Sequence, residues 1–227
     1  MMVEKQKNSV FKYKSINGQI EYLLDILYNK KIYLPTIKEL NDPMEGVGKL
    51  YFSYAGSGYY AGTSRLPSIY EETLSEYRIL SLSEDNDNWV MWSHYADCFK
   101  GICLEFSNSG ALSNIEKVNY IDEYEEIFCE SDEDIRATLR NKTKDWAYEN
   151  EWRLIVKSDQ NFLKLEKNDL LCLIVGEKVP TNTRRCLKEI CDANSIEFKV
   201  AYVDPYKCIV DFKSLEDFEI MLKQMER

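Results

Sequence analysis

Residues 145–155 read DWAYENEWRLI, a stretch in which acidic and aromatic side chains precede an apolar run. From Glu151 onward, alternating aromatic, aliphatic and charged residues predict a β-strand with one face buried. Because side chains alternate between the two faces of a strand, Glu151 and Arg153 are expected on the same face. Such a pair is either a catalytic acid with its orienting partner or a charge pair that fixes a loop.

The length of 227 residues suits one large domain, so we predict a single domain over residues 1–227. Hydrophobic residues make up 44% of the chain, enough for a sizeable core. No apolar run reaches the roughly 20 residues that a membrane span needs, and the first residues lack the apolar core of a signal peptide. Seven cysteines without a CxxC pair predict free, buried thiols rather than structural zinc. These features predict a cytoplasmic protein without a membrane partner.

The formal net charge of -10 argues against a broad surface for binding duplex nucleic acid, which requires lysines and arginines at the phosphates. Much of the acidic excess lies in residues 122–134, which contain eight acids and no base. We interpret this segment as a solvated surface or as a contact for a basic protein partner.

Short segments with strand and helix patterns alternate irregularly along the chain. This mixture predicts an α+β fold with a mixed, mostly antiparallel sheet, continuous or split, and flanking helices. Strands are predicted at 10–15, 31–34, 78–84, 101–106, 117–121, from Glu151, 170–176, 197–203 and 206–212. Helices are predicted at 18–29, 67–77, 89–95, 133–144, 182–194 and 215–225.

Polar residues that interrupt this pattern are candidates for a site. Asn41 and Asp42 precede Pro43 in an NDP turn, which is either an ordinary turn or one that faces a ligand. His94 is the only histidine, so a multi-histidine metal site is excluded, and we expect His94 to donate a hydrogen bond inside the fold or to line a pocket. No metal ligands are assigned, and no phosphate-binding glycine loop is recognised in residues 46–61.

Three stretches, namely KYKS with IYLPTIKELNDPMEG, then SLSEDNDNWVMWSHYADCFKGICLEF, then KDWAYENEWRLI, resemble the bacterial family called domain of unknown function 2971 over residues 11–157. The opening strand, helix, IYL strand and NDP turn are also similar in layout to ADP-ribosyltransferase-like proteins. In those folds a split, mostly antiparallel sheet holds NAD. The resemblance implies an ADP-ribosyltransferase or NAD glycohydrolase, with NAD as substrate and a macromolecular acceptor, serving as a toxin or phage-defence effector.

The resemblance also implies the roles of particular residues. The first-strand element falls on Lys12 or Tyr13, the middle element on Ser81, Ser83 or Tyr95, and the late glutamate on Glu151. Lysine stands where histidine or arginine often opens the motif. The expected catalytic residues are Glu151, Arg153 and Tyr95, and the expected cofactor-binding residues are Lys12, Tyr13, Asn41, Asp42, Ser83, Trp92 and His94. We expect eight of these residues to converge on one cleft, namely Tyr13, Asn41, Asp42, Trp92, His94, Tyr95, Glu151 and Arg153.

Two other functions remain open. A metal-dependent nuclease would use Glu149, Glu151 and Lys157, although the usual catalytic lysine lies two residues beyond the acid, where Arg153 stands. A binding module would use the same polar residues only to brace the fold. For that bracing role, we predict that Asp42 or Glu45 pairs with Arg153 and pins the NDP turn to the strand.

Overall fold

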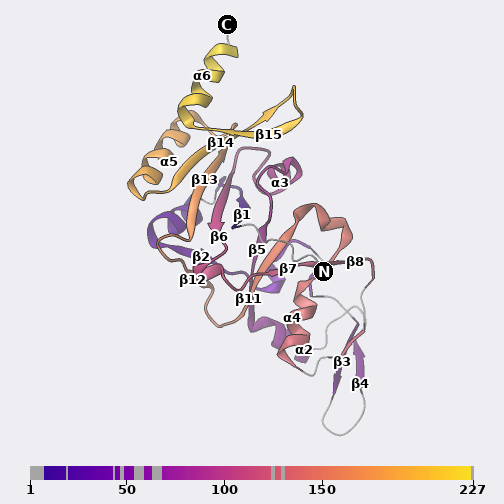
Figure 1. Ribbon diagram of the computed structural model, residues 1–227. Helices are drawn as coiled ribbons and strands as arrows, with labels where there is room; N and C mark the ends of the chain where they lie inside the picture. Colours follow the sequence, from indigo (N-terminus) through magenta and orange to yellow (C-terminus); the bar gives the residue numbers. More distant parts are fainter. Residues whose placement is uncertain are drawn as a thin grey trace. The chain divides into compact units, whose positions relative to one another are not determined.

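The computed structural model describes residues 8–18, 20–42, 44–46, 49–53, 59–62, 68–123, 126–128 and 131–225. They form an α+β fold with a large mixed sheet and several helices (Figure 1), as the sequence predicts. The chain divides into two compact units, each assembled from separate segments. Unit 1 comprises Met1–Ile32, Leu82–Ser113 and Lys164–Arg227, and unit 2 comprises Tyr33–Ser81 and Asn114–Leu163. A single domain over residues 1–227 stays a prediction.

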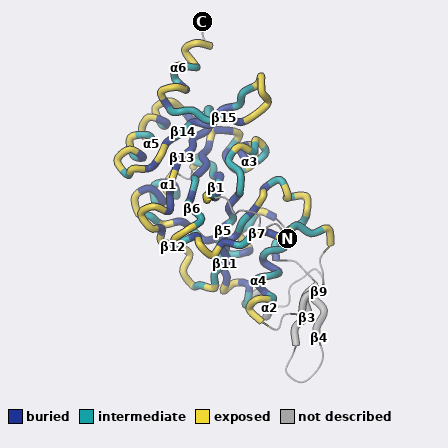
Figure 2. Tube along the Cα trace, in the orientation of Figure 1, coloured by how far each residue is buried: buried dark blue, intermediate teal, exposed yellow. Residues whose placement is uncertain are grey.

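The sheet of unit 1 has the strand order β15-β14-β13-β6-β1. Its strands are β1 (Ser9–Lys14), β6 (Ile102–Ser107), β13 (Leu170–Gly176), β14 (Glu197–Asp204) and β15 (Ile209–Lys213). The end of β5 (Tyr77–Ser83) extends this order, because Ser83 lies opposite Phe11 of β1. β13 and β14 are parallel, whereas β1 with β6, β6 with β13, and β14 with β15 are antiparallel. The central strands are almost wholly buried, as Figure 2 shows.

Helices of unit 1 flank this sheet, mostly where periodicity predicts them. They are α1 (Ile20–Leu24), the π-helix η1 (Asp25–Asn29), α3 (Trp89–Tyr95), the 3-10 turn η3 (Gly110–Leu112), α5 (Thr181–Ala193) and α6 (Leu215–Met225). α3 begins after Asn88, whose side chain accepts the N–H of Val90 at 2.9 Å, a standard N-cap. The predicted helix over 18–29 is divided into α1 and η1, which bury Leu23, Ile26 and Leu27.

A left-handed turn links α3 to β6 in unit 1. Asp97, Cys98 and Phe99 have φ values of 47°, 51° and 69°, a conformation that side chains with a Cβ rarely adopt. Two glycines next to this turn allow backbone groups to approach more closely than a Cβ would permit. A Cβ on Gly101 would lie 2.4 Å from the carbonyl oxygen of Lys14, and one on Gly176 would lie 2.1 Å from that of Phe99.

The cysteines are free where described, but the prediction that they are buried is only half right. Those buried are Cys103, Cys172 and Cys191, and those exposed are Cys98, Cys186 and Cys208. The predicted strand over 206–212 would bury Cys208, yet this residue lies in the exposed turn between β14 and β15 with a φ of 55°. Asp204 forms that turn by accepting the N–H groups of Tyr206 and Lys207.

Unit 2 contains the greater part of β5, followed in sheet order by β11 (Glu151–Lys157) and β7 (Glu116–Lys117). Two small sheets accompany it: β10 (Asn141–Thr143) with β8 (Asn119–Ile121), and β4 (Tyr59–Gly62) with β3 (Lys49–Ser53) and β9 (Glu126–Phe128). Its helices are α2 (Ser68–Ser75), α4 (Asp132–Arg140) and the 3-10 segments η2 (Ile37–Glu39) and η4 (Lys144–Glu149). A further sheet pairs β2 (Lys31–Tyr33) with β12 (Phe162–Lys164).

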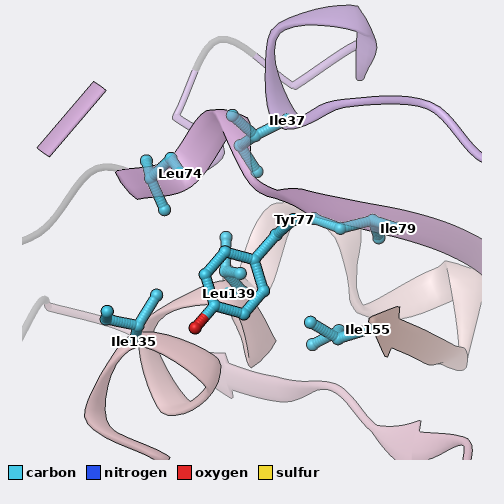
Figure 3. Close-up of a cluster of buried hydrophobic side chains, with 7 residues drawn as sticks. All are labelled: Ile37, Leu74, Tyr77, Ile79, Ile135, Leu139 and Ile155. Carbon is cyan, nitrogen blue, oxygen red and sulfur yellow. The ribbon is translucent and has the colours of Figure 1, made fainter. Parts of the chain in front are cut away.

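An apolar cluster forms the core of unit 2 around the ring of Tyr77 (Figure 3). The members of this cluster are Ile37, Leu74, Tyr77, Ile79, Ile135, Leu139 and Ile155. The hydroxyl of Tyr77 donates to Oδ1 of Asp132 at 2.6 Å, so the ring is buried while its polar end is satisfied at the start of α4. Among the described residues, no helix combines the length and the apolar character needed to cross a membrane.

Candidate functional site

Arg153 lies on β11 and is completely buried in unit 2. Its Nη1 and Nη2 donate to Oε2 and Oε1 of Glu45 at 2.8 and 2.5 Å. Its Nε and Nη2 donate to the two carboxylate oxygens of Glu151 at 2.7 and 3.1 Å, and Nη1 also reaches the carbonyl oxygen of Leu139 at 2.6 Å. A guanidinium has five N–H donors in a rigid fork, and all five are used here.

Lys142 supplies the second buried cation from β10. Its Nζ donates to Glu149 at 2.5 Å and to Glu151 at 2.9 Å, and it lies 3.7 Å from Glu45. The ammonium also lies 5.0 Å from the centroid of the Trp146 ring, which faces it as a cation–π partner. We call Glu45, Lys142, Glu149, Glu151 and Arg153 the charge cluster, and each of these side chains is at most 6% exposed.

The charge cluster has three carboxylates and two cations, a formal net charge of -1 in a nearly dry space. Burial favours the neutral form of Glu151, but Arg153 and Lys142 outweigh it and hold the pKa of that carboxyl well below its usual range. Burial favours the neutral form of Lys142 too, which for an amine would lower the pKa, but the charges of Glu151 and Glu149 raise the pKa of Lys142. At Glu45 burial prevails over Arg153, so its pKa is raised, and Glu45 binds a proton before Glu151 does as the pH falls.

Acid should therefore weaken unit 2 through Glu151. The folded pKa of Glu151 is below its ordinary value of 4.5, so its charge stabilises the fold above that pH and this contribution is lost as the pH falls through the folded pKa. The difference in free energy of unfolding between wild type and Glu151→Gln should shrink below pH 4.5, by up to about 1.4 kcal/mol per pH unit. Urea titrations from neutral pH downward measure it, and a constant difference would contradict the assignment.

The sequence expectation for β11 is right about the strand and incomplete about its faces. Glu151, Arg153 and Ile155 are all buried, whereas Trp152 and Val156 on the other face are half-buried. Leu154 on that other face is also buried, so both faces of β11 have buried side chains, and the charged Glu151 and Arg153 are among them. This is possible because the chain's own ions neutralise one another there.

The NDP turn is connected to β11 through Glu45, which confirms one form of the predicted pair. The alternative partner, Asp42, is 5% exposed and instead accepts the N–H of Met44 on its Oδ1 at 2.8 Å. Its Oδ2 has no hydrogen-bond partner in the described part of the chain. Asn41 lies exposed at the start of the same turn.

Two of the aromatic candidates lie in the interior of unit 1. Tyr13 donates its hydroxyl proton to the carbonyl oxygen of Asp85 at 2.8 Å and meets Trp92 edge-on, with ring centroids 5.4 Å apart. Trp92 is fully buried, stacks on Phe99 at 5.1 Å and donates its indole N–H to the carbonyl oxygen of Asn86 at 2.8 Å. These rings pack against the chain itself, which is a core role.

The remaining candidates of unit 1 lie on β1, β5 and α3. Ser83 is buried and its hydroxyl oxygen accepts the N–H of Asp85 at 3.2 Å, while Lys12 is half-buried on β1. His94 is exposed rather than interior, and its ring contacts that of the half-buried Tyr95. The alternative role of His94, lining a pocket, stays a prediction. All six candidates of unit 1 lie outside the unit that contains Glu151 and Arg153. Convergence of the eight residues named above on one cleft stays a prediction.

The residues of the nuclease hypothesis are divided between two environments. Glu149 and Glu151 bind Lys142 in the charge cluster, whereas Lys157 is half exposed and pairs with Glu76 at 2.8 Å. No group of three or more histidine, cysteine or acidic residues suited to a metal ion occurs in the described ranges. The acidic segment 122–134 is described except at 124–125 and 129–130, which lie outside those ranges.

Lys142 is the functional candidate that sequence reasoning missed. The helix predicted over 133–144 would have placed it on a helix surface, but α4 ends at Arg140 and β10 begins at Asn141. Asn141, Lys142 and Thr143 carry no apolar periodicity that would signal a strand. Its register is fixed instead by parallel pairing with β8, where Lys142 lies opposite Tyr120.

Comparison with known proteins gives one family match. The family described as Protein of unknown function (DUF2971) matches residues 91–154, from α3 to β11. No curated protein and no solved structure matches the chain. The matched stretch contains Lys142, Glu149, Glu151 and Arg153, whereas Glu45 lies before it. The match supports placing this part of the chain in that family, as the sequence resemblance predicts.

Proposed function

We propose that this chain uses NAD, as an ADP-ribosyltransferase or NAD glycohydrolase, with Glu151 as the residue that stabilises the reacting ribose. The observation that carries the proposal is the interaction of the Ser81 side chain with the carboxylate of Glu151 in unit 2, one of the contacts that lower the pKa of Glu151. The resemblance to ADP-ribosyltransferase-like proteins implies a mid-chain serine and a late strand glutamate. Here those two residues touch, on neighbouring strands of one sheet.

The electrostatics of the charge cluster suit this chemistry. Breaking the bond between nicotinamide and ribose builds positive charge on the sugar, and a fixed, ionised carboxylate stabilises that charge. Glu151 is held ionised by Arg153 and Lys142, and the charge cluster as a whole has one negative charge in excess. A low-dielectric surrounding strengthens the attraction between such a site and a cationic transition state.

Access to Glu151 requires one of its partners to release it, because its side chain is 3% exposed. We assign this movement to Lys142, which has a flexible four-carbon stem and a second carboxylate, Glu149, to retain its ion pair. Arg153 cannot play this part, since its rigid fork binds Glu45, Glu151 and the Leu139 carbonyl together. Arg153 is therefore a positioning residue for Glu151.

A second function, a binding module without catalysis, is favoured by a different observation. All five donors of Arg153 bind groups of this same chain, and the charge cluster joins the NDP turn, β10 and β11. In that case the charge cluster only braces unit 2. The two functions differ in a directly measurable property, the consumption of NAD.

Purified wild-type protein incubated with NAD decides between them. Chromatography should detect released nicotinamide, and labelled NAD should mark any modified acceptor in added bacterial protein extract. A non-hydrolysable NAD analogue is the matched control, because it should bind, raise the melting temperature and release nothing. Protein that neither binds nor consumes millimolar NAD overturns the proposal and leaves the binding module.

A further inference from the structure

The last strand of the unit 1 sheet has an open edge. β15 pairs with β14 on one side, and within the described ranges no strand pairs with it on the other. The N–H of Phe212 donates to Oδ1 of Asp211 at 2.8 Å, which places this N–H on the side of β15 away from β14. Because backbone groups alternate along a strand, Val210 also directs its backbone to the open side. Such an edge is a template for another strand.

The side chains along this edge are arranged with opposite charges two residues apart. Asp211 accepts the hydroxyl proton of Tyr202 on Oδ2 at 2.9 Å, and Lys213 Nζ lies 5.5 Å from the centroid of the same ring. Asp211 and Lys213 therefore share one face of β15, and Phe212 lies on the other. All three side chains are half-buried, so each retains surface that a second strand would cover.

We propose that a second copy of this chain pairs with the open edge of β15, its own β15 running antiparallel across a two-fold axis at Phe212. In this register, Asp211 of each copy lies opposite Lys213 of the other, and the two Phe212 rings lie opposite each other. Opposite charges and aromatic pairs at facing positions stabilise antiparallel strands. Self-complementarity of this kind is what a two-fold interface requires.

The neighbouring registers are disfavoured by charge. Centring the axis on Asp211 would place two carboxylates opposite each other, and centring it on Lys213 would do the same with two ammonium groups. Like charges at facing positions are destabilising, so the register at Phe212 is selected. The Phe212 N–H would then exchange its bond to Asp211 for one to the carbonyl of Phe212 in the second copy, which frees the Asp211 carboxylate to face Lys213.

A charge exchange tests this interface. Sedimentation velocity of the full chain over about 1 to 200 µM should show a concentration-dependent dimer. Asp211→Lys and Lys213→Asp should each raise the dimer Kd about tenfold or more, because each places like charges opposite each other twice. The double variant carrying both changes should return the Kd to within about threefold of wild type. The matched control exchanges Lys188 and Asp192, an exposed pair on α5, and should leave the Kd unchanged.

A covalent measurement keeps the proposal testable if a single variant fails to fold. Facing residues of a hydrogen-bonded antiparallel pair have Cα atoms about 5.5 Å apart, within the range that a disulfide spans. In a Cys208→Ser background, Phe212→Cys should form an intermolecular disulfide under mild oxidation, whereas Tyr206→Cys in the exposed turn should not. A monomer at all concentrations, a dimer that both single variants leave unchanged, or no disulfide at position 212 overturns the proposal. None of these outcomes depends on NAD.

Discussion

Arg153→Ala should lower the free energy of unfolding by about 3–5 kcal/mol, the usual cost of removing one partner from a buried ion pair. The substitution leaves Glu45 and Glu151 buried without their guanidinium, and it changes the formal charge of the cluster from -1 to -2. For a chain of this length, the melting temperature should fall by about 10 °C. Arg153→Lys should give an intermediate loss, since three donors replace five.

The location of this loss can be measured as well as its size. Amide hydrogen exchange should speed up in α4, β10 and β11 of unit 2, while β13 and β14 of unit 1 retain their protection. The matched control is Arg185→Ala, which removes an exposed arginine paired with Glu219 and should change neither measurement appreciably. If the melting curve of Arg153→Ala overlays that of the wild type, the buried ion pair contributes nothing to the stability of the fold.

Glu151→Gln should slow nicotinamide release at least about a hundredfold, or about 3 kcal/mol, if Glu151 stabilises a cationic ribose. The change preserves the shape of the side chain and deletes its charge. Glu45 and Glu149 then balance Lys142 and Arg153, so the cluster becomes neutral rather than more negative. For this reason the variant should remain folded and should lose less stability than Arg153→Ala.

The assay compares nicotinamide release by wild type, Glu151→Gln and Glu76→Gln, together with their melting curves. Glu76 is an exposed acid of unit 2 that pairs with Lys157, so its substitution should alter neither rate nor stability. Unchanged turnover by Glu151→Gln would remove Glu151 from the reaction. If Glu151→Gln loses stability and none of the three proteins forms a product from NAD, the charge cluster only braces the fold of unit 2.

The fold could be predicted from the sequence mainly where side-chain periodicity is strong. β13 and α5 are found where the apolar run 170–176 and the helical pattern after Thr181 predict them. Local sequence patterns are less informative where a turn determines the residue at which a strand begins. Asp204 accepts two backbone N–H groups and extends the turn through Cys208, so β15 begins only at Ile209 rather than at Tyr206.

The candidate site was predicted in part, for a physical reason. Glu151 and Arg153 are two residues apart on one strand, so their pairing follows from strand geometry. The prediction that Glu45 or Asp42 binds Arg153 rests on chemical complementarity, and Glu45 is the one that does. Lys142 reaches Glu149 and Glu151 only because α4 stops at Arg140, a boundary that the local sequence does not mark.

The interleaved segments of the two units set an order of events during synthesis. Every segment of unit 2 lies between Tyr33 and Leu163, whereas unit 1 still lacks Lys164–Arg227 when Leu163 has been added. The ribosome thus delivers the whole charge cluster, from Glu45 to Arg153, before β13 has been made. Until then the left-handed turn at 97–99 has no Lys178 N–H to bind the Phe99 carbonyl. A nascent chain can therefore complete unit 2 while the first two segments of unit 1 still await their central strand.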